Sequence, residues 1–478
     1  MISKGYPYEE IARIIEGKII TWNNDKIIRS FSNRMNRVAE GSLYFFYEDW
    51  EDEDALIAEM TKRNAAGIVI NRNQKLDVEK WSQAGLGILG VFMLDPAYYN
   101  LARFYRSKID IPIVEVIGSS GKTTTKEMIG AILQYSMPAL VGYANLNSTS
   151  GIIAQLTGIQ DFHKAAVIEA GMKRKGEMGL SSSIVRPTSG VVTGINRSHF
   201  ARMGSIDEII SAKAEMLEYL SEDGCLIING SDENCSRFPV ERYKGKVLTF
   251  GFSDKCDIWA SDIRYKNFTT TFKAHYDKGT MDCTLNAVGK YNVSNALAAI
   301  MVGLKIGITP DNIVQGLLRF KPFSSRMEIL KGIKGTTIIN DNYNANPDST
   351  GMLLNEIPAF AGKQPVILVM GDMENPAEEI SDYARKVHFE IGEQIGRLKV
   401  DGLFAIGKWA EEYVNGAAGQ GMDRAKLHYF KNIEDAGEAL LKNITAGSII
   451  LFKASKAYVD LGKLISMLRQ LGEGQYGK

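Results

Sequence analysis

A glycine-rich turn, Gly118-Ser119-Ser120-Gly121-Lys122-Thr123, constrains the fold of this chain more than any other segment. It directly follows the apolar run 113–117 and leads into a helical apolar pattern over residues 128–133. A strand, a glycine turn and a helix in this order predict a phosphate-binding loop, because the glycines let backbone N–H groups converge on phosphate oxygens at a helix N-terminus. Lys122 would reach the outer phosphates, and the Thr123 hydroxyl would hold magnesium.

The spacing of this turn departs from the generic phosphate-loop pattern. Gly118 lies four positions before Lys122, whereas the generic pattern places five residues between its first glycine and its lysine. The alternative interpretation is a flexible turn between a strand and a helix, with an exposed lysine. The strand and helix patterns on either side favour the phosphate loop over this alternative.

The apolar run before the turn is one of a series. From residue 111 onward, β-type apolar runs that end in Gly or Asn alternate with helical patterns. These runs cover residues 111–118, 165–171, 190–196 and 224–230. Their alternation predicts a doubly wound, mainly parallel sheet. Residues 269–285 change to an alternating pattern rich in Thr, Phe and Tyr, which predicts a short antiparallel meander attached to that sheet.

The chain length of 478 residues predicts two or three domains, and the patterns favour three, all of the α/β class. We expect the phosphate loop and its sheet to form a central domain over residues 108–325. Residues 326–478 predict a second, smaller α/β domain, because buried strand patterns again lie between helices. These patterns cover 336–340, 365–371, 402–407 and 448–453. Residues 1–107 predict a small N-terminal α/β domain.

The composition restricts the partners and the compartment. The 56 basic residues equal the 56 acidic residues, so no overall field favours nucleic acid or an acidic membrane surface, and we expect neither as a partner. The four cysteines lack the spacing of a zinc site and the density of a disulfide framework. No signal-peptide order opens the sequence, and the longest apolar run, 84–94, is too short to span a bilayer. We therefore expect a cytoplasmic protein without a membrane span.

Two polar residues follow later strand patterns at the edge that carries the phosphate loop. Glu169 lies at the end of the strand pattern that begins at residue 165, where a carboxylate would offer magnesium the oxygen ligand that it prefers. The alternative for Glu169 is an acidic residue that begins a loop. His199 follows the run 190–196 by three residues, and by position alone it is more often a surface histidine than a ligand.

Lys213 lies at an unexpected position on a predicted helix. Ser205-Ile206-Asp207-Glu208 forms a capping box, and apolar residues follow at helical spacing on one face, which also includes Lys213. A lysine on a buried face needs a reason, because apolar neighbours cannot replace the hydration of an ammonium group. One explanation is that the alkyl stem carries the ammonium out to water. The other is conversion to a carbamate, which would make Lys213 an anionic oxygen ligand.

Together these segments resemble the successive motifs of the Mur ligase family in order and spacing. The matching segments are residues 118–124, 169–172, 176–177, 186–187, 196–199, 212–215 and 289–296, the last of which resembles the adenine-binding motif. Arg326 resembles the arginine that opens the last domain of the family. The resemblance extends over residues 111–460, which is most of the chain.

Residues 341–349, Asp-Asn-Tyr-Asn-Ala-Asn-Pro-Asp-Ser, resemble the signature of the branch that adds D-alanyl-D-alanine to UDP-N-acetylmuramoyl-tripeptide, as do residues 371–373 with His388. The resemblance implies an ATP-dependent, ADP-forming ligase of cell-wall precursor synthesis. It would activate a carboxylate of a UDP-muramoyl-peptide-like substrate as an acyl phosphate and couple it to an amine such as D-alanyl-D-alanine. We expect small-molecule substrates and a monomeric enzyme.

The resemblance also implies the domain functions and the role of each matching residue. The domains would be an N-terminal nucleotide-sugar-binding domain, a central ATPase and a C-terminal Rossmann-like domain that closes over ATP and the amine. The ATP-binding residues would be Gly118, Ser119, Ser120, Gly121, Lys122, Thr123, Thr124, Asn295, Arg326 and Asp341, with Asn295 at the adenine. Magnesium would be held by Thr123, Glu169, His199 and a carbamylated Lys213. Lys122, Lys213, His199 and Glu169 would be the catalytic residues.

The N-terminal domain differs from that branch. The branch carries Asp-Ser-Arg, a gated loop and an Asp-Gly-His segment that help to hold the UDP sugar, whereas this chain has Ser32-Asn33-Arg34 and no Asp-Gly-His. This difference leaves open a paralogue with the same chemistry on another carboxylate and amine. A nucleotide-binding switch or scaffold is a further alternative. It is less favoured because Lys122, Glu169 and Lys213 are all present and no guanine-binding Asn-Lys-x-Asp motif is found.

Overall fold

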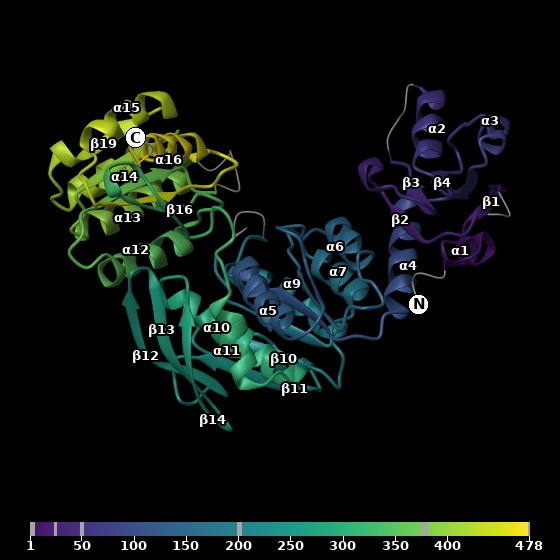
Figure 1. The fold of residues 1–478 in the computed structure, drawn as a ribbon, viewed down its shortest axis with the longest axis horizontal. Coiled ribbons are helices and arrows are strands. Elements are labelled where there is room, and N and C mark those ends of the chain that lie inside the picture. The colour runs from purple at the N-terminus through teal and green to yellow at the C-terminus, as the bar shows by residue number, and fades with distance from the viewer. Residues whose placement is uncertain (1–4, 23–25, 48–51, 198–202, 375–380, 477–478) are drawn as a thin grey trace.

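The computed structural model describes residues 5–22, 26–47, 52–197, 203–374 and 381–476. It contains three β-sheets, with five strands in the N-terminal unit, nine in the central unit and six in the C-terminal unit. The N-terminal and C-terminal units rise from opposite ends of the central unit, which gives the molecule an open U shape (Figure 1). Within these described ranges, no helix has both the length and the apolar character needed to cross a membrane.

The N-terminal unit is a small, mostly parallel sheet with helices. Its elements are α1 (Tyr8–Ile14), β1 (Lys18–Thr21), β2 (Ser30–Ser32), β3 (Ser42–Phe45), α2 (Glu53–Lys62), β4 (Gly67–Asn71), α3 (Val78–Gln83), β5 (Gly87–Val91) and α4 (Leu94–Ser107). The strand order is β1-β5-β4-β3-β2, and only the β1–β5 pair is antiparallel. Every residue of β3 and of β5 is buried, as expected for strands covered on both faces. The expected small α/β domain is confirmed.

The central unit is a nine-stranded sheet that carries the phosphate loop. Its first elements are β6 (Ile113–Ile117), α5 (Lys122–Ser136), β7 (Ala139–Val141), α6 (Thr149–Leu156), β8 (Ala165–Glu169), α7 (Glu177–Val185), β9 (Ser189–Val192), α9 (Ile206–Ala214) and β10 (Cys225–Asn229). The later ones are β11 (Lys246–Gly251), β12 (Ile258–Lys266), β13 (Thr269–Tyr276), β14 (Gly279–Leu285), α10 (Lys290–Ile306) and α11 (Pro310–Leu318). The strand order is β14-β13-β12-β11-β10-β9-β6-β8-β7. Strands β12 to β14 pair antiparallel and the other pairs are parallel, so the expected doubly wound sheet and meander are both confirmed.

The strand β6 shows why this sheet forms and how it places the loop. All five of its residues are buried, and alternate residues face opposite sides of the sheet. Val114 and Val116 join a core with α5 and α10, whereas Ile113 and Ile117 join a core with α6, α7 and α9. Because β6 lies between β8 and β9, its carboxyl end directs the phosphate loop to an interior position of the sheet's carboxyl edge, where such folds bind ligands.

The C-terminal unit is a Rossmann-like layer of parallel strands with one antiparallel edge strand. Its elements are β15 (Glu328–Lys331), β16 (Thr337–Asp341), α12 (Pro347–Ala361), β17 (Val366–Gly371), α13 (Ser381–Arg397), β18 (Gly402–Ile406), α14 (Glu411–Gly419), β19 (Leu427–Phe430), α15 (Ile433–Asn443), β20 (Ile449–Lys453) and α16 (Gly462–Tyr476). The strand order is β15-β16-β20-β17-β18-β19, with β15 antiparallel to β16. The domain boundaries that we propose, after residues 107 and 325, fall outside every strand.

The N-terminal and central units share one buried core, and a buried arginine joins them. Arg106, near the end of α4, is 8% exposed. Its guanidinium donates hydrogen bonds to the carbonyl oxygens of Val185 (2.6 Å), Ile109 (2.7 Å) and Arg186 (2.9 Å). Arg106 therefore satisfies carbonyls at the C-terminus of α7 and attaches α4 to the central sheet.

The C-terminal unit contacts the central unit at the first turn and the middle of α12. At the first turn, Asp348 accepts hydrogen bonds from the Arg197 side chain (2.7 Å) and from the Arg197 backbone N–H (2.9 Å). Further along the helix, Glu356 accepts bonds from the Tyr265 hydroxyl (2.9 Å) and the Lys290 backbone N–H (3.1 Å). These polar contacts hold α12 across the carboxyl edge of the central sheet.

Candidate functional site

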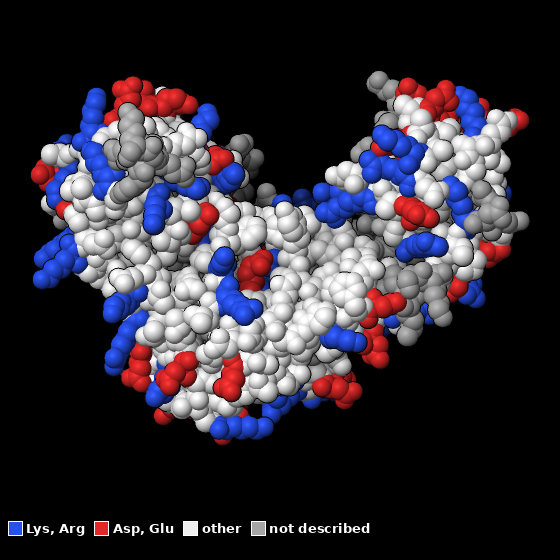
Figure 2. Space-filling model, in the orientation of Figure 1, with Lys and Arg blue, Asp and Glu red and all other residues white. Residues whose placement is uncertain are grey.

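A large cavity of about 1480 Å³ lies where the three units meet. Its floor is the phosphate loop together with the carboxyl ends of neighbouring central strands. The C-terminal unit supplies one wall, which includes Arg326, Asp341 and Tyr343, and the N-terminal unit supplies another, formed by Asn33, Tyr47, Asp95, Tyr98 and Tyr99. Figure 2 shows the molecule hollowed between the raised N-terminal and C-terminal units, with basic and acidic side chains interspersed on that face.

The phosphate loop has the conformation that its glycines predict. Gly118 and Gly121 have positive φ values of 142° and 84°, and a Cβ on Gly118 would overlap the Thr193 hydroxyl oxygen. The Ser119 N–H donates to the Gly194 carbonyl (2.8 Å), and the Thr193 hydroxyl donates to the Ser120 carbonyl (2.5 Å). The segment after β9 thus braces the loop. Gly121 begins α5 without a side-chain cap, which leaves N–H groups at the helix N-terminus for an anion.

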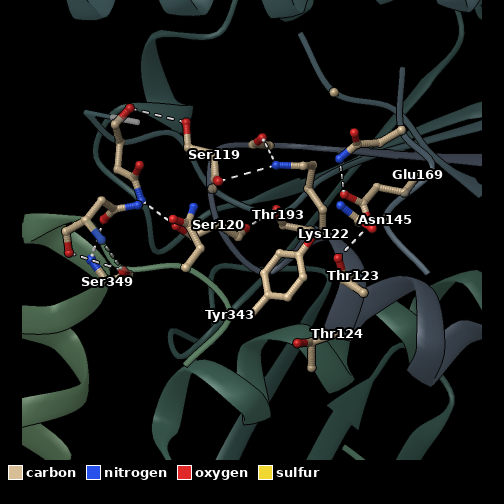
Figure 3. Close-up of a pocket in the computed structure, with 18 of the residues that line it drawn as sticks. Ser119, Ser120, Lys122, Thr123, Thr124, Asn145, Glu169, Thr193, Tyr343 and Ser349 are labelled. Carbon is tan, nitrogen blue, oxygen red and sulfur yellow. Dashed lines mark hydrogen bonds between the residues drawn. The ribbon is translucent and has the colours of Figure 1, made fainter. Parts of the chain in front are cut away.

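Lys122 lies at the floor of the cavity and folds back over the loop. Its Nζ donates to the carbonyl oxygens of Gly118 (3.0 Å) and Ser119 (3.4 Å). Desolvation lowers the pKa of Lys122. The nearby carboxylate of Glu169 raises this pKa, whereas the positive charge of Arg326 lowers it further. Figure 3 shows Tyr343, from the C-terminal unit, beside Lys122. Lys122 is therefore placed to contact an anionic ligand from the central unit, and the C-terminal unit would approach the same ligand from the opposite side.

Glu169 is held by hydrogen bonds on both of its oxygens. It ends β8 and is 3% exposed. The Thr123 hydroxyl donates to its Oε2 (2.6 Å), and the Asn147 amide donates to its Oε1 (2.7 Å). A hydroxyl and a carboxylate oxygen in contact beside a phosphate loop fit a magnesium ion, which takes one or two protein oxygens and completes its shell with phosphates and water. His199 lies in segment 198–202, outside the described residues.

Lys213 is buried as its helical position predicts. It is 3% exposed, and its Nζ donates to the Gly118 carbonyl (2.9 Å). Burial lowers the pKa of Lys213 well below its usual value, and the nearby positive charge of Lys122 lowers it further. The side chain of Lys213 does not reach bulk water. The structure therefore does not support the explanation in which the alkyl stem carries the ammonium group out to water. The amine instead lies under the phosphate loop.

The remaining predicted residues surround the loop. Asn295 is buried, and a Cβ on Gly121 would overlap its amide oxygen, so Asn295 lies against the loop. Arg326 places its guanidinium 4.0 Å from the centre of the Tyr343 ring, and its Nε has no hydrogen-bond partner among the described residues. Thr124 also lines the cavity. The structure thus brings together every predicted site residue that it describes.

Asp341 is engaged by a lysine that the sequence analysis did not include among the site residues. Lys453, at the end of β20, forms a 2.6 Å ion pair with Asp341 and donates to the Asn344 carbonyl (2.8 Å). Asn147, the partner of Glu169, was likewise not among the predicted site residues. Lys453 had a signal, because it ends a strand at a carboxyl edge, whereas Asn147 lies six residues after β7 and had none. The N-terminal wall of tyrosines and Asp95 had no such signal, since only the tertiary arrangement brings it to the cavity.

Comparisons with known proteins agree with this geometry. Residues 116–303 match the Mur ligase middle domain, and residues 325–456 match the Mur ligase, glutamate ligase domain. The chain is 33% identical over 362 residues to a UDP-N-acetylmuramoyl-tripeptide–D-alanyl-D-alanine ligase of Bacillus subtilis (strain 168), an alignment that covers 75% of this chain and 76% of that protein.

Solved structures have the same fold over nearly the whole chain. A crystal structure of MurF from Acinetobacter baumannii has a TM-score of 0.83 at 24% identity and covers 98% of this chain and 100% of that one. MurF ligase from Thermotoga maritima in complex with ADP has a TM-score of 0.77 at 22% identity and covers 94% and 99%. The sequence matches, and the phosphate loop with its buried lysine and carboxylate, lead to one conclusion: this chain belongs to the Mur ligase family.

Proposed function

We propose that this Mur ligase joins the free carboxylate of a UDP-N-acetylmuramoyl-tripeptide to the amine of D-alanyl-D-alanine, as a cytoplasmic monomer. Members of the family are ATP-dependent, ADP-forming amide ligases, and the chain is one of them. The observation that carries the substrate assignment is one cavity shared by all three units, in which Lys122, Glu169 and Lys213 converge. The similarity to the Bacillus subtilis ligase supports the same pair of substrates.

In this proposal the central unit binds the triphosphate. Residues 118–124 surround the phosphates through backbone N–H groups, Lys122 neutralises charge on the outer phosphates, and Asn295 contacts the base. Arg326 and Asp341 approach the nucleotide from the C-terminal unit. Thr123, Glu169, His199 and Lys213 would hold magnesium, which when bound supplies positive charge to the phosphate oxygens.

Lys213 would act in this set as a carbamate. Burial lowers the pKa of Lys213 and so favours its unprotonated amine, and only the unprotonated nitrogen reacts with carbon dioxide. A bond then forms between Nζ and the carbon, a proton leaves the nitrogen, and the product carries a negative charge on oxygen. The burial and its place under the phosphate loop support this assignment.

The chemistry follows from this placement. A carboxylate oxygen of the acceptor attacks the γ-phosphorus of ATP and ADP leaves, which gives an acyl phosphate. The amine nitrogen attacks the acyl carbon and loses a proton, and phosphate departs with the former carboxylate oxygen. Acyl phosphates hydrolyse readily, so water must be excluded, and the contacts of Asp348 and Glu356 with the central unit hold the C-terminal wall over the cavity.

A second candidate is a paralogue that acts on another carboxylate and amine with the same chemistry. The observation that favours it is the N-terminal wall, because the described residues that line the cavity there are Asn33, Tyr47, Asp95, Tyr98 and Tyr99, with no lysine or arginine among them. A diphosphate would find no basic side chain among these five lining residues, whereas sugar hydroxyls and ring faces would find acceptors and aromatic surfaces.

Turnover with defined substrates tests both candidates. The protein is incubated with ATP, magnesium, UDP-N-acetylmuramoyl-tripeptide and D-alanyl-D-alanine, and phosphate release and the product mass are measured. We expect phosphate release that requires both substrates, and a product joined by one new amide bond. No turnover with this pair, but turnover with another acid and amine, would establish the paralogue. Hydrolysis that needs no amine and yields no covalent product would exclude a ligase.

A further inference from the structure

A second lysine of helix α5 is completely buried without taking any part in the proposed chemistry. Lys126 lies one turn beyond Lys122 and has an exposed fraction of 0%. Its ammonium group donates to the carbonyl oxygens of Gly142 and Ala144, the latter at 2.9 Å, and lies 2.7 Å from the Glu127 carboxylate. Burying an ammonium group costs free energy unless its partners compensate. The place of the two carbonyl partners in the fold therefore indicates the role of Lys126.

Both carbonyls belong to the loop of residues 142–147, which joins β7 to α6. Ala144 has a φ of 49°, a left-handed conformation that a residue with a side chain rarely adopts, and its carbonyl is one of the two that Lys126 binds. From the other side, the Gln155 amide donates to the Leu146 carbonyl (2.5 Å). Two buried polar side chains thus hold the 142–147 loop in one conformation, which packing alone would not select.

The last residue of this loop reaches the proposed magnesium site. Asn147 donates its side-chain amide to Glu169 Oε1 (2.7 Å), and its carbonyl accepts from the Gly171 N–H (2.9 Å). The other carboxylate oxygen of Glu169 accepts from Thr123, which lies on α5 three residues before Lys126. Helix α5 therefore fixes Glu169 twice, directly through Thr123 and indirectly through Lys126, the loop and Asn147. Figure 3 shows Thr123, Asn145 and Glu169 gathered on one side of Lys122.

We propose that Lys126 is a positioning residue of the ligase, which orients Glu169 for a divalent cation by holding the 142–147 loop and hence Asn147. Lys126 itself touches neither the nucleotide site nor the carboxylate. Without Lys126 the loop that carries Asn147 loses two hydrogen bonds, so Glu169 keeps its charge while the direction of its bond from Asn147 is less firmly fixed. The inference rests on the proposed magnesium-dependent function of the site.

The test compares Lys126→Met with a matched control elsewhere in the chain. Arg106→Met also removes a buried cation that binds backbone carbonyls, but these carbonyls do not belong to the loop that carries Asn147. For each protein, magnesium chloride is titrated at a fixed ADP concentration by calorimetry, amide hydrogen exchange of the 142–147 loop is measured without ligand, and kcat is measured at saturating magnesium. Lys126→Gln, which keeps hydrogen-bond donors, provides the same test if Lys126→Met does not fold.

We expect Lys126→Met to raise the magnesium concentration for half-saturation about tenfold, as for other residues that orient a metal ligand. Exchange of the loop should rise, and kcat at saturating magnesium should stay within about threefold of the wild type. Arg106→Met should lower thermal stability without changing the magnesium constant. If Lys126 acts through Asn147, the double variant Lys126→Met/Asn147→Ala should have the same constant as Asn147→Ala alone.

Three results would overturn the proposal. These are an unchanged magnesium constant in Lys126→Met, a change no larger than that of Arg106→Met, and additive effects in the double variant. The titration and the exchange experiment need neither the acid nor the amine substrate. A wrong substrate assignment would therefore abolish turnover in all the proteins while leaving these two measurements to decide the role of Lys126.

Discussion

The central strand β6 carries a carboxyl group in the apolar interior, and this group should make the stability of the protein depend on pH. Glu115 is 0% exposed. Its Oε2 accepts a hydrogen bond from the Ser182 hydroxyl (2.9 Å), whereas its Oε1 has no partner among the described residues. Desolvation raises the pKa of Glu115 from 4.5 to about 8, with the Ser182 bond opposing the shift. The folded protein therefore keeps this carboxyl neutral at pH 7.

The direction and size of the effect follow from proton linkage. Below pH 4.5 Glu115 is protonated in both the folded and the unfolded state, so it does not favour either. As pH rises towards 8, the unfolded state loses this proton and the folded state retains it, so the free energy of unfolding falls. Between pH 5.5 and 8.5 this loss amounts to about 3 kcal/mol, since each unit of pKa difference is worth about 1.4 kcal/mol.

The substitution Glu115→Gln isolates this contribution, because the amide does not ionise and its oxygen still accepts from Ser182. The melting temperature of each protein is measured by scanning calorimetry at pH 5.5 and 8.5. We expect the wild type to lose about 6–12 °C more than Glu115→Gln between the two pH values, given about 2–4 °C per kcal/mol for a domain of the size of the central one. An equal loss in both proteins would refute the argument that Glu115 is protonated in the folded state.

Three further outcomes are expected. Lys122→Ala should reduce amide formation about 10²–10³-fold, because the outer phosphates lose their fixed positive charge; unchanged phosphate release would contradict the role of the loop. Asp348→Asn removes the carboxylate charge that pairs with Arg197 between the central and C-terminal units. This pair is partly exposed and is worth about 1 kcal/mol or less, so KM for ATP should rise no more than about fivefold. KM should also become less sensitive to salt. Equal salt sensitivity in both proteins would argue against that contact. Depleting carbon dioxide should lower the activity and bicarbonate should restore it if Lys213 works as a carbamate, whereas indifference to carbon dioxide would count against the modification.

Much of the fold was predictable because the strands are buried on both faces. The predicted runs 165–171 and 224–230 contain β8 (Ala165–Glu169) and β10 (Cys225–Asn229), whose residues are almost all buried. Such runs consist of consecutive apolar residues, so they can be recognised without knowing their neighbours. The run 190–196 extends four residues beyond β9 (Ser189–Val192), because the chain leaves the sheet there to brace the phosphate loop. That bracing contact cannot be read from local composition.

The site was predictable where one short segment contains its own signal. Residues 113–133 combine strand, turn and helix in one stretch, and Lys213 is conspicuous because a charge interrupts an apolar helical face. Lys453 and Asn147 act through partners far along the chain, on Asp341 and Glu169, and the sequence offers no local mark of such pairs. Lys126 precedes the apolar pattern of residues 128–133, and only the structure reveals the carbonyls that it binds.

The central claim is that an oxygen of the acid substrate attacks the γ-phosphorus of ATP before the amine attacks the acyl carbon. The direct measurement uses an acceptor whose reacting carboxylate carries ¹⁸O on both oxygens, with ATP, magnesium and the amine, followed by mass spectrometry of the released phosphate and of the product. We expect one labelled oxygen in each phosphate and the other in the new amide carbonyl. Phosphate that carries only unlabelled oxygen, with product formed at the same time, would contradict the account.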